Sequence, residues 1–310
     1  MTSFCVEFCL VMIAWGSKYS DRHIQYIHEN AKKSVGYRST ILLTDKLRSN
    51  LSDEIEQKHI PEFYDKQEFF KGGLRAKIAI FDRTILPKET VCLYVDLDSL
   101  ILGDLQSVVK LLKSKNEILM LPPRGLGKIR IVARLLARIT SGKFFPVGNS
   151  SIMLFNSSAS PNISDSFKLL YHNEKREEHF SIDDVIISWC SKRNLNWFPK
   201  TTCTMFRRKY MSRSVVVLYF TLLIELFFRT KTEPAILTFN DDFCKPDALV
   251  KLRPGKKAVD MKGRNLIWSK RFLGPTHDAI HAWDRYLNAK DINTVTKKST
   301  FNLDKTNGCT

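Results

Sequence analysis

The sequence lacks the patterns that mark several common classes of protein. Its seven cysteines are odd in number and never form Cys-x-x-Cys, which argues against a structural zinc site. No Gly-x-Gly-x-x-Gly is present, so a dinucleotide cofactor is not supported. There is no internal repeat and no low-complexity tract. We therefore expect a globular protein in a reducing compartment, with the cysteines as small core residues.

Long apolar runs are also scarce. The stretch Phe4–Trp15 is interrupted by Glu7, has no basic segment before it and shows no small-residue cleavage site. It is therefore interpreted as a first core strand and not as a signal peptide. We therefore expect a cytoplasmic protein.

The most apolar stretch is Ser214–Phe228. As a helix its fifteen residues would span about 22 Å, which is short of the ~30 Å hydrocarbon core of a bilayer. Glu225 lies within it, and basic residues flank it on both sides. We expect either a buried core helix or a segment that lies in a membrane interface, on the inner face of the membrane.

Acidic residues are few relative to basic ones. The 310 residues include 49 lysines and arginines against 32 aspartates and glutamates, for a formal net charge of +17. Such an excess implies an anionic partner: nucleic acid, a phosphate-bearing substrate or an acidic membrane surface. Residues 124–143 carry six basic side chains and no acidic one, with Arg130, Arg134 and Arg138 on one helical face. This segment is predicted to be either a membrane-surface helix or a solvated helix packed on the core.

The most informative stretch runs from Thr90 to Leu105. Its apolar start, Val91–Val95, is typical of a strand buried on both faces of a parallel sheet. Asp96 and Asp98 follow, and strand alternation would point them to the same side. Two ionised, unpaired carboxylates at a buried strand end would cost several kcal/mol, so they need cations. A divalent metal that carries phosphate oxygens meets that need, at the sheet edge where open α/β folds bind ligands.

The remaining pattern predicts an α/β fold. The expected strands are 6–15, 37–44, 117–121, 152–155 and a last one at 236–239, besides a short strand within 46–72. The expected helices start at Ser20 or Asp21 and run through Lys33, and cover 74–81, 107–113, 181–189 and 276–287. Arg75, Lys77 and Arg83 are expected to point toward the carboxylates of the central stretch. A loose polar tail begins at about Asn293.

Two further segments carry small or acidic polar residues. Gly148-Asn149-Ser150-Ser151 opens a core strand, where small side chains allow a ligand to approach the backbone. Asp183 and Asp184 lie near a helix start, where they are either functional groups or dipole-stabilised caps. Trp15 and Tyr19 are either base-stacking aromatics or ordinary core and surface residues.

These pieces, in this order, resemble GT-A nucleotide-sugar glycosyltransferases, close to glycosyltransferase family 8 and its bacterial relatives. The resemblance runs from about Val6 to Pro246. It rests on the following segments: Ala14-Trp15-Gly16-x-x-Tyr19, Leu43-Thr44-Asp45, a basic helix with Lys77, Tyr94-Val95-Asp96-Leu97-Asp98, residues 148–156, Asp183-Asp184, Trp197-Phe198-Pro199 and Lys245-Pro246.

The resemblance implies an α/β GT-A fold with a mainly parallel central sheet flanked by helices. It implies transfer of a sugar, with retention of configuration, from a nucleoside diphosphate (a uridine donor) to a glycan, polysaccharide or lipid-linked acceptor. It implies a divalent cation, Mn²⁺ or Mg²⁺. The GT-A domain would cover 1–290, with a basic and apolar membrane-proximal insert at about 200–232, and 291–310 would be a polar tail.

The resemblance also implies roles for individual residues. Asp96 and Asp98 would bind the metal, with Asp96 also near the ribose. The donor would contact Lys77, Ser150 and Lys245, the last of these at the diphosphate. Its sugar would face the catalytic group of Asn149, Asp183 and Asp184, and its base would lie near Trp15 and Tyr19.

One departure from the family pattern concerns the metal. The family places a histidine near Lys-Pro as a further ligand, whereas this chain has Phe239-Asn240-Asp241-Asp242. Either Asp241 or Asp242 replaces the imidazole with a carboxylate, which hard cations accept, or metal affinity is weakened, or activity is lost.

Two other hypotheses remain at this point. Asp96-Leu97-Asp98-Ser99-Leu100 also resembles the nucleophile motif of haloacid-dehalogenase phosphohydrolases, with Asp96 as nucleophile, although that motif usually opens the chain. A non-catalytic basic protein that binds nucleic acid or membrane would explain the charge. It would leave the strand-end aspartates unexplained, so nucleic acid is the less favoured partner.

Overall fold

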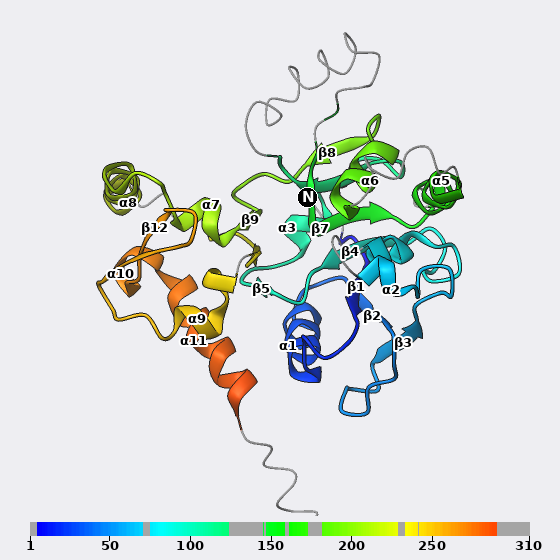
Figure 1. The fold of residues 1–310 in the computed structure, drawn as a ribbon, viewed down its shortest axis with the longest axis horizontal. Coiled ribbons are helices and arrows are strands. Elements are labelled where there is room, and N and C mark those ends of the chain that lie inside the picture. The colour runs from blue at the N-terminus through cyan, green and yellow to red at the C-terminus, as the bar shows by residue number, and fades with distance from the viewer. Residues whose placement is uncertain are drawn as a thin grey trace, which may run out of the picture.

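A seven-stranded sheet forms the centre of the protein (Figure 1). The computed structural model describes residues 5–70, 75–123, 145, 147–158, 161–172, 182–228, 233–240 and 242–289. The strands, in their spatial order, are β3 (Ile55–His59), β2 (Tyr37–Thr44), β1 (Phe8–Ala14), β4 (Val91–Val95), β7 (Asn149–Asn156), β6 (Ile118–Leu121) and β8 (Leu195–Trp197). Of these, β7 runs antiparallel to both its neighbours, and the other paired strands are parallel. The predicted α/β fold with a mainly parallel sheet is confirmed.

The central strands are apolar on both faces because both faces are covered. All seven residues of β1 are buried, and its neighbour β4 pairs with it from Phe8 opposite Val91 to Val11 opposite Tyr94. Alternate residues enter different cores: Val11 and Tyr94 belong to one hydrophobic cluster, and Leu10 to another. This burial accounts for the continuous apolar runs of the sequence.

Helices cover the two faces of the sheet. On one face lie α1 (Asp21–Lys32) and α3 (Gln106–Val109), and on the other lie the 3₁₀ helix η1 (Arg75–Phe81), α5 (Pro161–His172) and α6 (Asp183–Cys190); α2 (Gln67–Phe70) packs beside η1. The predicted helices at 74–81 and 107–113 are therefore a 3₁₀ turn and a single α-turn respectively. Ser20 immediately precedes α1, but its hydroxyl contacts His23 and does not cap the helix.

A smaller lobe, formed mostly by the second half of the chain together with β5, lies beside the main sheet (Figure 1). Its sheet has the order β5 (Ser99–Ile101), β10 (Ile236–Thr238) and β9 (Cys203–Met205). Around it lie α7 (Phe206–Tyr210), α8 (Val215–Phe228), η4 (Asp242–Cys244), α9 (Pro246–Leu249), the hairpin β11 (Lys257–Val259) and β12 (Asn265–Ile267), α10 (Lys270–Leu273) and α11 (Pro275–Asn288). A third core cluster, which includes Phe206, Trp268 and Trp283, holds this lobe together.

The prediction that 236–239 is the last strand is wrong, because β11 and β12 follow it. These two strands have only three residues each, and β11 is largely exposed, so they leave no apolar run in the sequence. The predicted helix at 276–287 is confirmed as α11.

Other expectations about the chain can be compared with the described residues. Cys9, Cys92, Cys203 and Cys244 are buried, as expected of core cysteines, whereas Cys5 is exposed. The basic segment 124–143 lies outside the described residues. Within the described part of the chain, no helix has the length and apolar character needed to cross a bilayer.

Candidate active site

A cleft of about 670 Å³ lies where β1 and β4 end and β7 begins. Because β7 is antiparallel to β4, its first residues meet the carboxyl end of that strand, with Ile152 opposite Val95. Eleven of the residues singled out by the sequence line this one cleft: Trp15, Tyr19, Lys77, Asp96, Asp98, Asn149, Ser150, Asp183, Asp184, Asp242 and Lys245. Asp241 lies outside the described residues.

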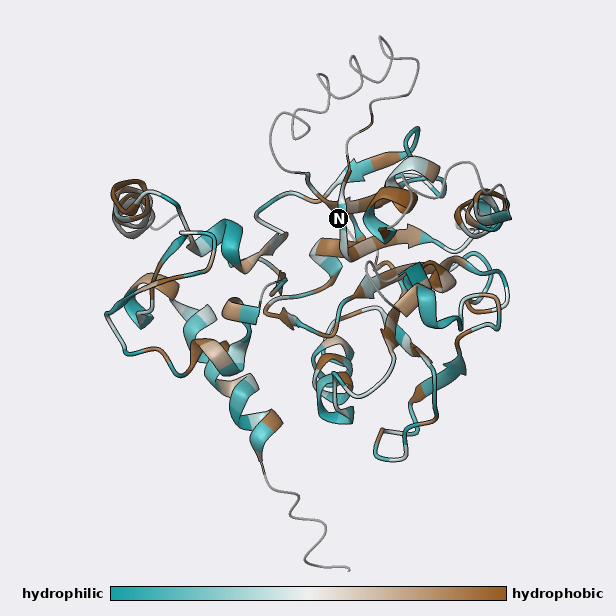
Figure 2. Cartoon of the chain, in the orientation of Figure 1, coloured by the Kyte–Doolittle hydropathy of each residue, from teal (hydrophilic) through white to brown (hydrophobic). Residues whose placement is uncertain are grey.

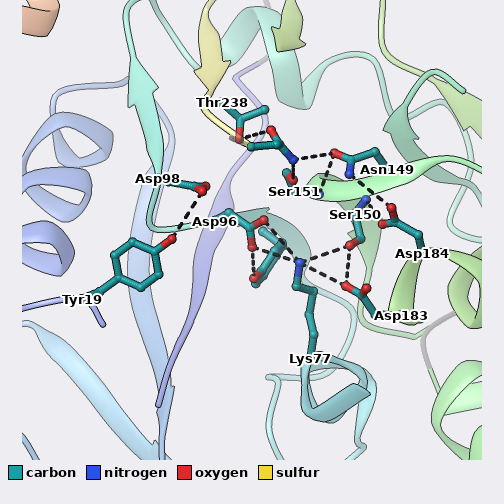
Figure 3. Close-up of polar contacts among 12 residues, drawn as sticks. Tyr19, Lys77, Asp96, Asp98, Asn149, Ser150, Ser151, Asp183, Asp184 and Thr238 are labelled. Atoms are coloured by element: carbon teal, nitrogen blue, oxygen red, sulfur yellow. Dashed lines mark hydrogen bonds and ion pairs between the residues drawn. The ribbon is translucent and has the colours of Figure 1, made fainter. Parts of the chain in front are cut away.

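Lys77 is the centre of the polar network in the cleft (Figure 3). Its side chain is almost completely buried, and its Nζ lies 3.0 Å from Asp96 Oδ1 and 3.2 Å from Asp183 Oδ2. Nζ also donates to Ser150 Oγ at 3.1 Å, and that hydroxyl donates to Asp183 Oδ2 at 2.6 Å. Burial alone would lower the pKa of Lys77, but the surrounding negative groups, Asp96 first, raise it well above its usual range. Lys77 is therefore a fixed positive charge between two carboxylates.

The other two cations expected near these carboxylates lie elsewhere. Arg75 donates to the backbone oxygen of Glu68, and Arg83 pairs with Asp165 on the surface. The prediction for these two arginines is wrong. The six residues that follow Arg75 in η1 are all buried, so Lys77 is held in the interior while Arg75, at the start of η1, turns toward α2.

Asp96 and Asp98 lie in the turn between β4 and β5, because β4 ends at Val95. Strand alternation therefore does not orient them, contrary to the prediction. The backbone N–H of Asp96 donates to the Ser151 oxygen at 2.8 Å, and Asp96 Oδ1 accepts a 2.5 Å hydrogen bond from the Tyr94 hydroxyl. Asp98 Oδ2 accepts from the Tyr19 hydroxyl at 3.3 Å.

The two carboxylates differ in their countercharge. Asp96 is paired with Lys77, but no lysine or arginine of the described residues forms a salt bridge with Asp98. Burial, and then the nearby charge of Asp96, raise the pKa of Asp98 to about 7. Asp98 is thus the carboxylate of the cleft that most needs a further positive charge.

Asp183 and Asp184 begin α6, where the helix dipole favours negative charge. Their side chains also form hydrogen bonds that connect α6 to the start of β7. Asp184 accepts from the Ser150 N–H at 2.6 Å and from Asn149 Nδ2 at 3.2 Å. Burial, and then the charge of Asp183, raise the pKa of Asp184. These contacts join Asn149, Ser150 and the aspartate pair into one unit.

Three solved glycosyltransferases share this architecture, although no family model and no curated protein matches the sequence. The bifunctional glycosyltransferase WbbM matches with a TM-score of 0.53 and 11% identity, over 95% of this chain and 52% of WbbM. An active-site mutant of LgtC matches with a TM-score of 0.52 and 12% identity, over 77% of this chain and 89% of LgtC. The glycosyltransferase GlyE of Streptococcus pneumoniae TIGR4 matches with a TM-score of 0.51 and 14% identity, over 96% of this chain and 64% of GlyE. This chain therefore spans about half of WbbM and somewhat under two thirds of GlyE. All three neighbours have the GT-A fold.

The chain has the GT-A fold.

Within this GT-A fold, several cleft residues were not anticipated from the sequence. They are Lys18, Tyr94, Arg207, Asn240, Met261 and Lys262. Asn240 stands in the segment where a histidine was expected, and its Nδ2 donates to Ser151 Oγ at 2.5 Å. Tyr94 was expected as part of the apolar strand and of the Tyr94–Asp98 motif, without a role of its own in the cleft. The sequence could have indicated both Asn240 and Tyr94, because each is a polar residue in or next to a segment already identified.

The segment around Asn240 bears on the expected metal ligands of the GT-A fold. Asp242 is largely exposed, and its Oδ1 accepts from Lys245 Nζ, which lowers the pKa of Asp242. Among the described residues, no group of three or more histidines, cysteines, aspartates or glutamates is arranged to hold a metal ion. The described part of this GT-A cleft thus offers Asp96 and Asp98 as a pair, with Asp242 paired to a lysine.

Gly148 also has a packing role that was not expected from the sequence. A Cβ atom at this position would lie 2.9 Å from the Trp197 ring and 3.0 Å from Met120 Cβ. The glycine therefore allows β7 to lie close to β6 and β8. On the other wall of the GT-A cleft, the Trp15 ring lies 5.7 Å from that of Phe70.

Proposed function

We propose that this protein is a glycosyltransferase that moves a sugar from a nucleoside diphosphate donor to a hydroxyl of a glycan, polysaccharide or lipid-linked acceptor. The proposal rests on one observation: in a GT-A fold, the cleft at the carboxyl edge of the sheet gathers Asp96, Asp98, Asp183 and Asp184 around a buried lysine. Its volume of about 670 Å³ is in the range of small-molecule sites.

The barrier to such a transfer lies in the departure of the diphosphate, which needs positive charge near its oxygens. Lys18, Arg207, Lys245 and Lys262 line the cleft and would supply part of it. Lys77 has a different role in this proposal. Its Nζ already contacts Asp96, Asp183 and Ser150, so it holds these groups in place for the donor.

A divalent cation, Mn²⁺ or Mg²⁺, would supply the remaining charge as a Lewis acid at the leaving diphosphate. The oxygen ligands that the cleft offers suit such a cation. Asp96 and Asp98 offer hard carboxylate oxygens, and Asp98 is partly buried without a salt bridge to any described lysine or arginine, with its pKa raised to about 7. Asp242, and Asp241 outside the described residues, are the further candidates for ligands.

We assign the other cleft residues by their position. Asn149, Asp183 and Asp184 would face the donor sugar, Ser150 would hold Asp183, and Lys245 would bind the diphosphate. Trp15 and Tyr19 would lie against a uracil base. Retention of anomeric configuration and placement at the cytoplasmic side of a membrane complete the proposal.

The alternative of a haloacid-dehalogenase phosphohydrolase is not favoured, because the structural neighbours are GT-A glycosyltransferases. The non-catalytic alternative leaves the buried aspartates and Lys77 without a purpose.

The test is a thermal-shift and turnover experiment on the full chain. UDP with Mn²⁺ is expected to raise the melting temperature, because a ligand that binds only the native state stabilises it. In a panel of nucleotide sugars, the Mn²⁺-dependent release of UDP by Asp98→Asn should fall at least about 100-fold, as expected for loss of a group that stabilises the departing charge. Asp165→Asn, on the surface beside Arg83, is the matched control and should be unchanged. Absence of any nucleotide-induced stabilisation, or full activity in Asp98→Asn, would contradict the proposal.

A further inference from the structure

Helix α8 exposes the largest group of apolar side chains among the described residues. Of twelve exposed large hydrophobic residues, six belong to α8: Val216, Val217, Tyr219, Phe220, Leu223 and Ile224. Val216 is 77% exposed and Phe220 is 65% exposed. The helix stands at the periphery of the molecule, and Figure 2 shows it as strongly hydrophobic. Contiguous apolar surface of this kind marks an interaction site.

Helix α8 is attached to the rest of the lobe by its N-terminal end and by the side chain of Leu218. The Val217 N–H is capped by Ser214 Oγ at 3.3 Å, and Ser212 forms a β-bridge with Asn265 of β12. Leu218 is buried against Ile267 and Phe272. The orientation of α8 is therefore set by the fold, and its outer face is presented to solvent.

The exposed face is too broad for a single partner helix. With 100° per residue, positions from Tyr219 through Val216 to Val217 cover an arc of about 160°, with Leu218 opposite its centre. A coiled-coil seam uses a narrower stripe, so another helix would leave part of this arc in water. A flat apolar medium covers the whole arc.

The charge around α8 indicates which medium this is. Residues 206–232 contain six lysines and arginines and one acidic residue, and residues 242–289, which include the contacts of the helix with β12 and Phe272, contain ten against five. Arg213, just before α8, and Arg271, next to Phe272, are exposed. A second copy of the chain, with its own formal net charge of +17, would be repelled at this surface.

We propose that α8 binds an anionic phospholipid bilayer and lies in the plane of its interface, with Val216, Val217, Phe220, Leu223 and Ile224 among the acyl chains. The fourteen residues of α8 are too few to span the bilayer, but they suit an interfacial helix. The exposed Arg213 and Arg271 beside it face the phosphate headgroups. This inference does not depend on the proposed reaction.

The test is flotation of the full chain with vesicles of phosphatidylcholine and phosphatidylglycerol, at low and high salt. The wild-type protein should float with these vesicles, less with phosphatidylcholine alone, and less at high salt. The double variant Val216→Ser/Phe220→Ser should bind at least about tenfold more weakly, because it removes apolar area that enters the bilayer. Equal binding by the double variant and the wild type would overturn the proposal.

A matched control separates this surface from general effects of losing an apolar residue. Leu169 is 66% exposed and belongs to α5, a helix on the opposite side of the molecule from α8 in Figure 1, so Leu169→Ser should bind vesicles as the wild type does. Three results would overturn the proposal: no vesicle binding by the wild type, equal binding to phosphatidylcholine alone, or a wild-type dimer in light scattering that the double variant makes monomeric. UDP release by the double variant should be unchanged, so the two proposals fail separately.

Discussion

In the cleft charged side chains are buried, whereas on α8 apolar side chains are exposed. Both arrangements cost free energy in the isolated chain, but they are compensated differently. Lys77 compensates Asp96 and Asp183 from within the protein. For the outer face of α8 the described residues contain no such partner. The comparison teaches that the cost of a buried charge or an exposed apolar face can be offset within the protein or only by a bound partner. Asp98 in the cleft resembles α8, because no described lysine or arginine offsets its charge.

The largest effect is expected from removing Lys77, the cation that offsets the negative charge of Asp96 and Asp183. Lys77→Met should lower the free energy of unfolding by about 3–5 kcal/mol, because the buried Asp183 and the partly buried Asp96 lose their partner. Urea denaturation measures this. Lys115→Met breaks an exposed pair with Glu89 and should change stability by less than about 1 kcal/mol. If both variants lose equally little, Lys77 does not compensate the cleft.

The next effect concerns how α8 is attached. Leu218→Ala should cost about 2 kcal/mol, at the low end for a buried leucine, because the cluster with Ile267 and Phe272 is small. Leu223→Ala, on the exposed side of the same helix, serves as the control and should cost clearly less. Equal costs in thermal or chemical denaturation would mean that both sides of α8 are covered.

Asp98 provides a test that depends on pH. Its folded pKa of about 7 exceeds the unfolded value of about 4, so the native state binds more protons between these values. Ionising Asp98 therefore destabilises the native state as pH rises from about 4 to about 7. In metal-free buffer, Asp98→Asn should be more stable than the wild type by about 1–2 kcal/mol at pH 8, and the difference should vanish near pH 4. A difference that does not vary with pH would show that Asp98 already has a countercharge.

The smallest effect is expected at the outer face of α8. Phe220→Ser should change the free energy of unfolding in solution by less than about 0.5 kcal/mol, because the side chain is 65% exposed. Chemical denaturation without vesicles measures this. A loss of more than about 1 kcal/mol would mean that Phe220 is covered in the free protein, which would remove the contrast between the two regions.

The sequence predicted the parts of the cleft that depend on local pattern. The apolar run Val91–Val95 became β4, and the polar residues that follow it lie in the cleft. Lys77 was identified as the cation, but Arg75 and Arg83 were assigned the same role and lie elsewhere. Three basic residues within nine positions look alike in a sequence. Burial of η1 distinguishes them, and that burial comes from segments distant in the chain.

Other features could not be predicted for the same reason. The hairpin β11–β12 has strands too short to show a period, and its place is set by the bridge from Asn265 to Ser212. The close packing of Trp197 and Met120 against Gly148 was not predicted either, because these residues come from distant segments. Whether α8 was a core helix or an interfacial one was left open, and its exposure is a property of the fold.

By itself the sequence determined which segments are apolar enough to form the sheet, and that a group of carboxylates follows the central strand. Local composition and periodicity determine both features, because they set which side chains of a segment can be buried. Only the tertiary structure decided that Lys77 pairs with Asp96 and Asp183, and that no described lysine or arginine pairs with Asp98. Charge pairing depends on distances of a few ångströms between residues far apart in the chain, and packing alone sets those distances.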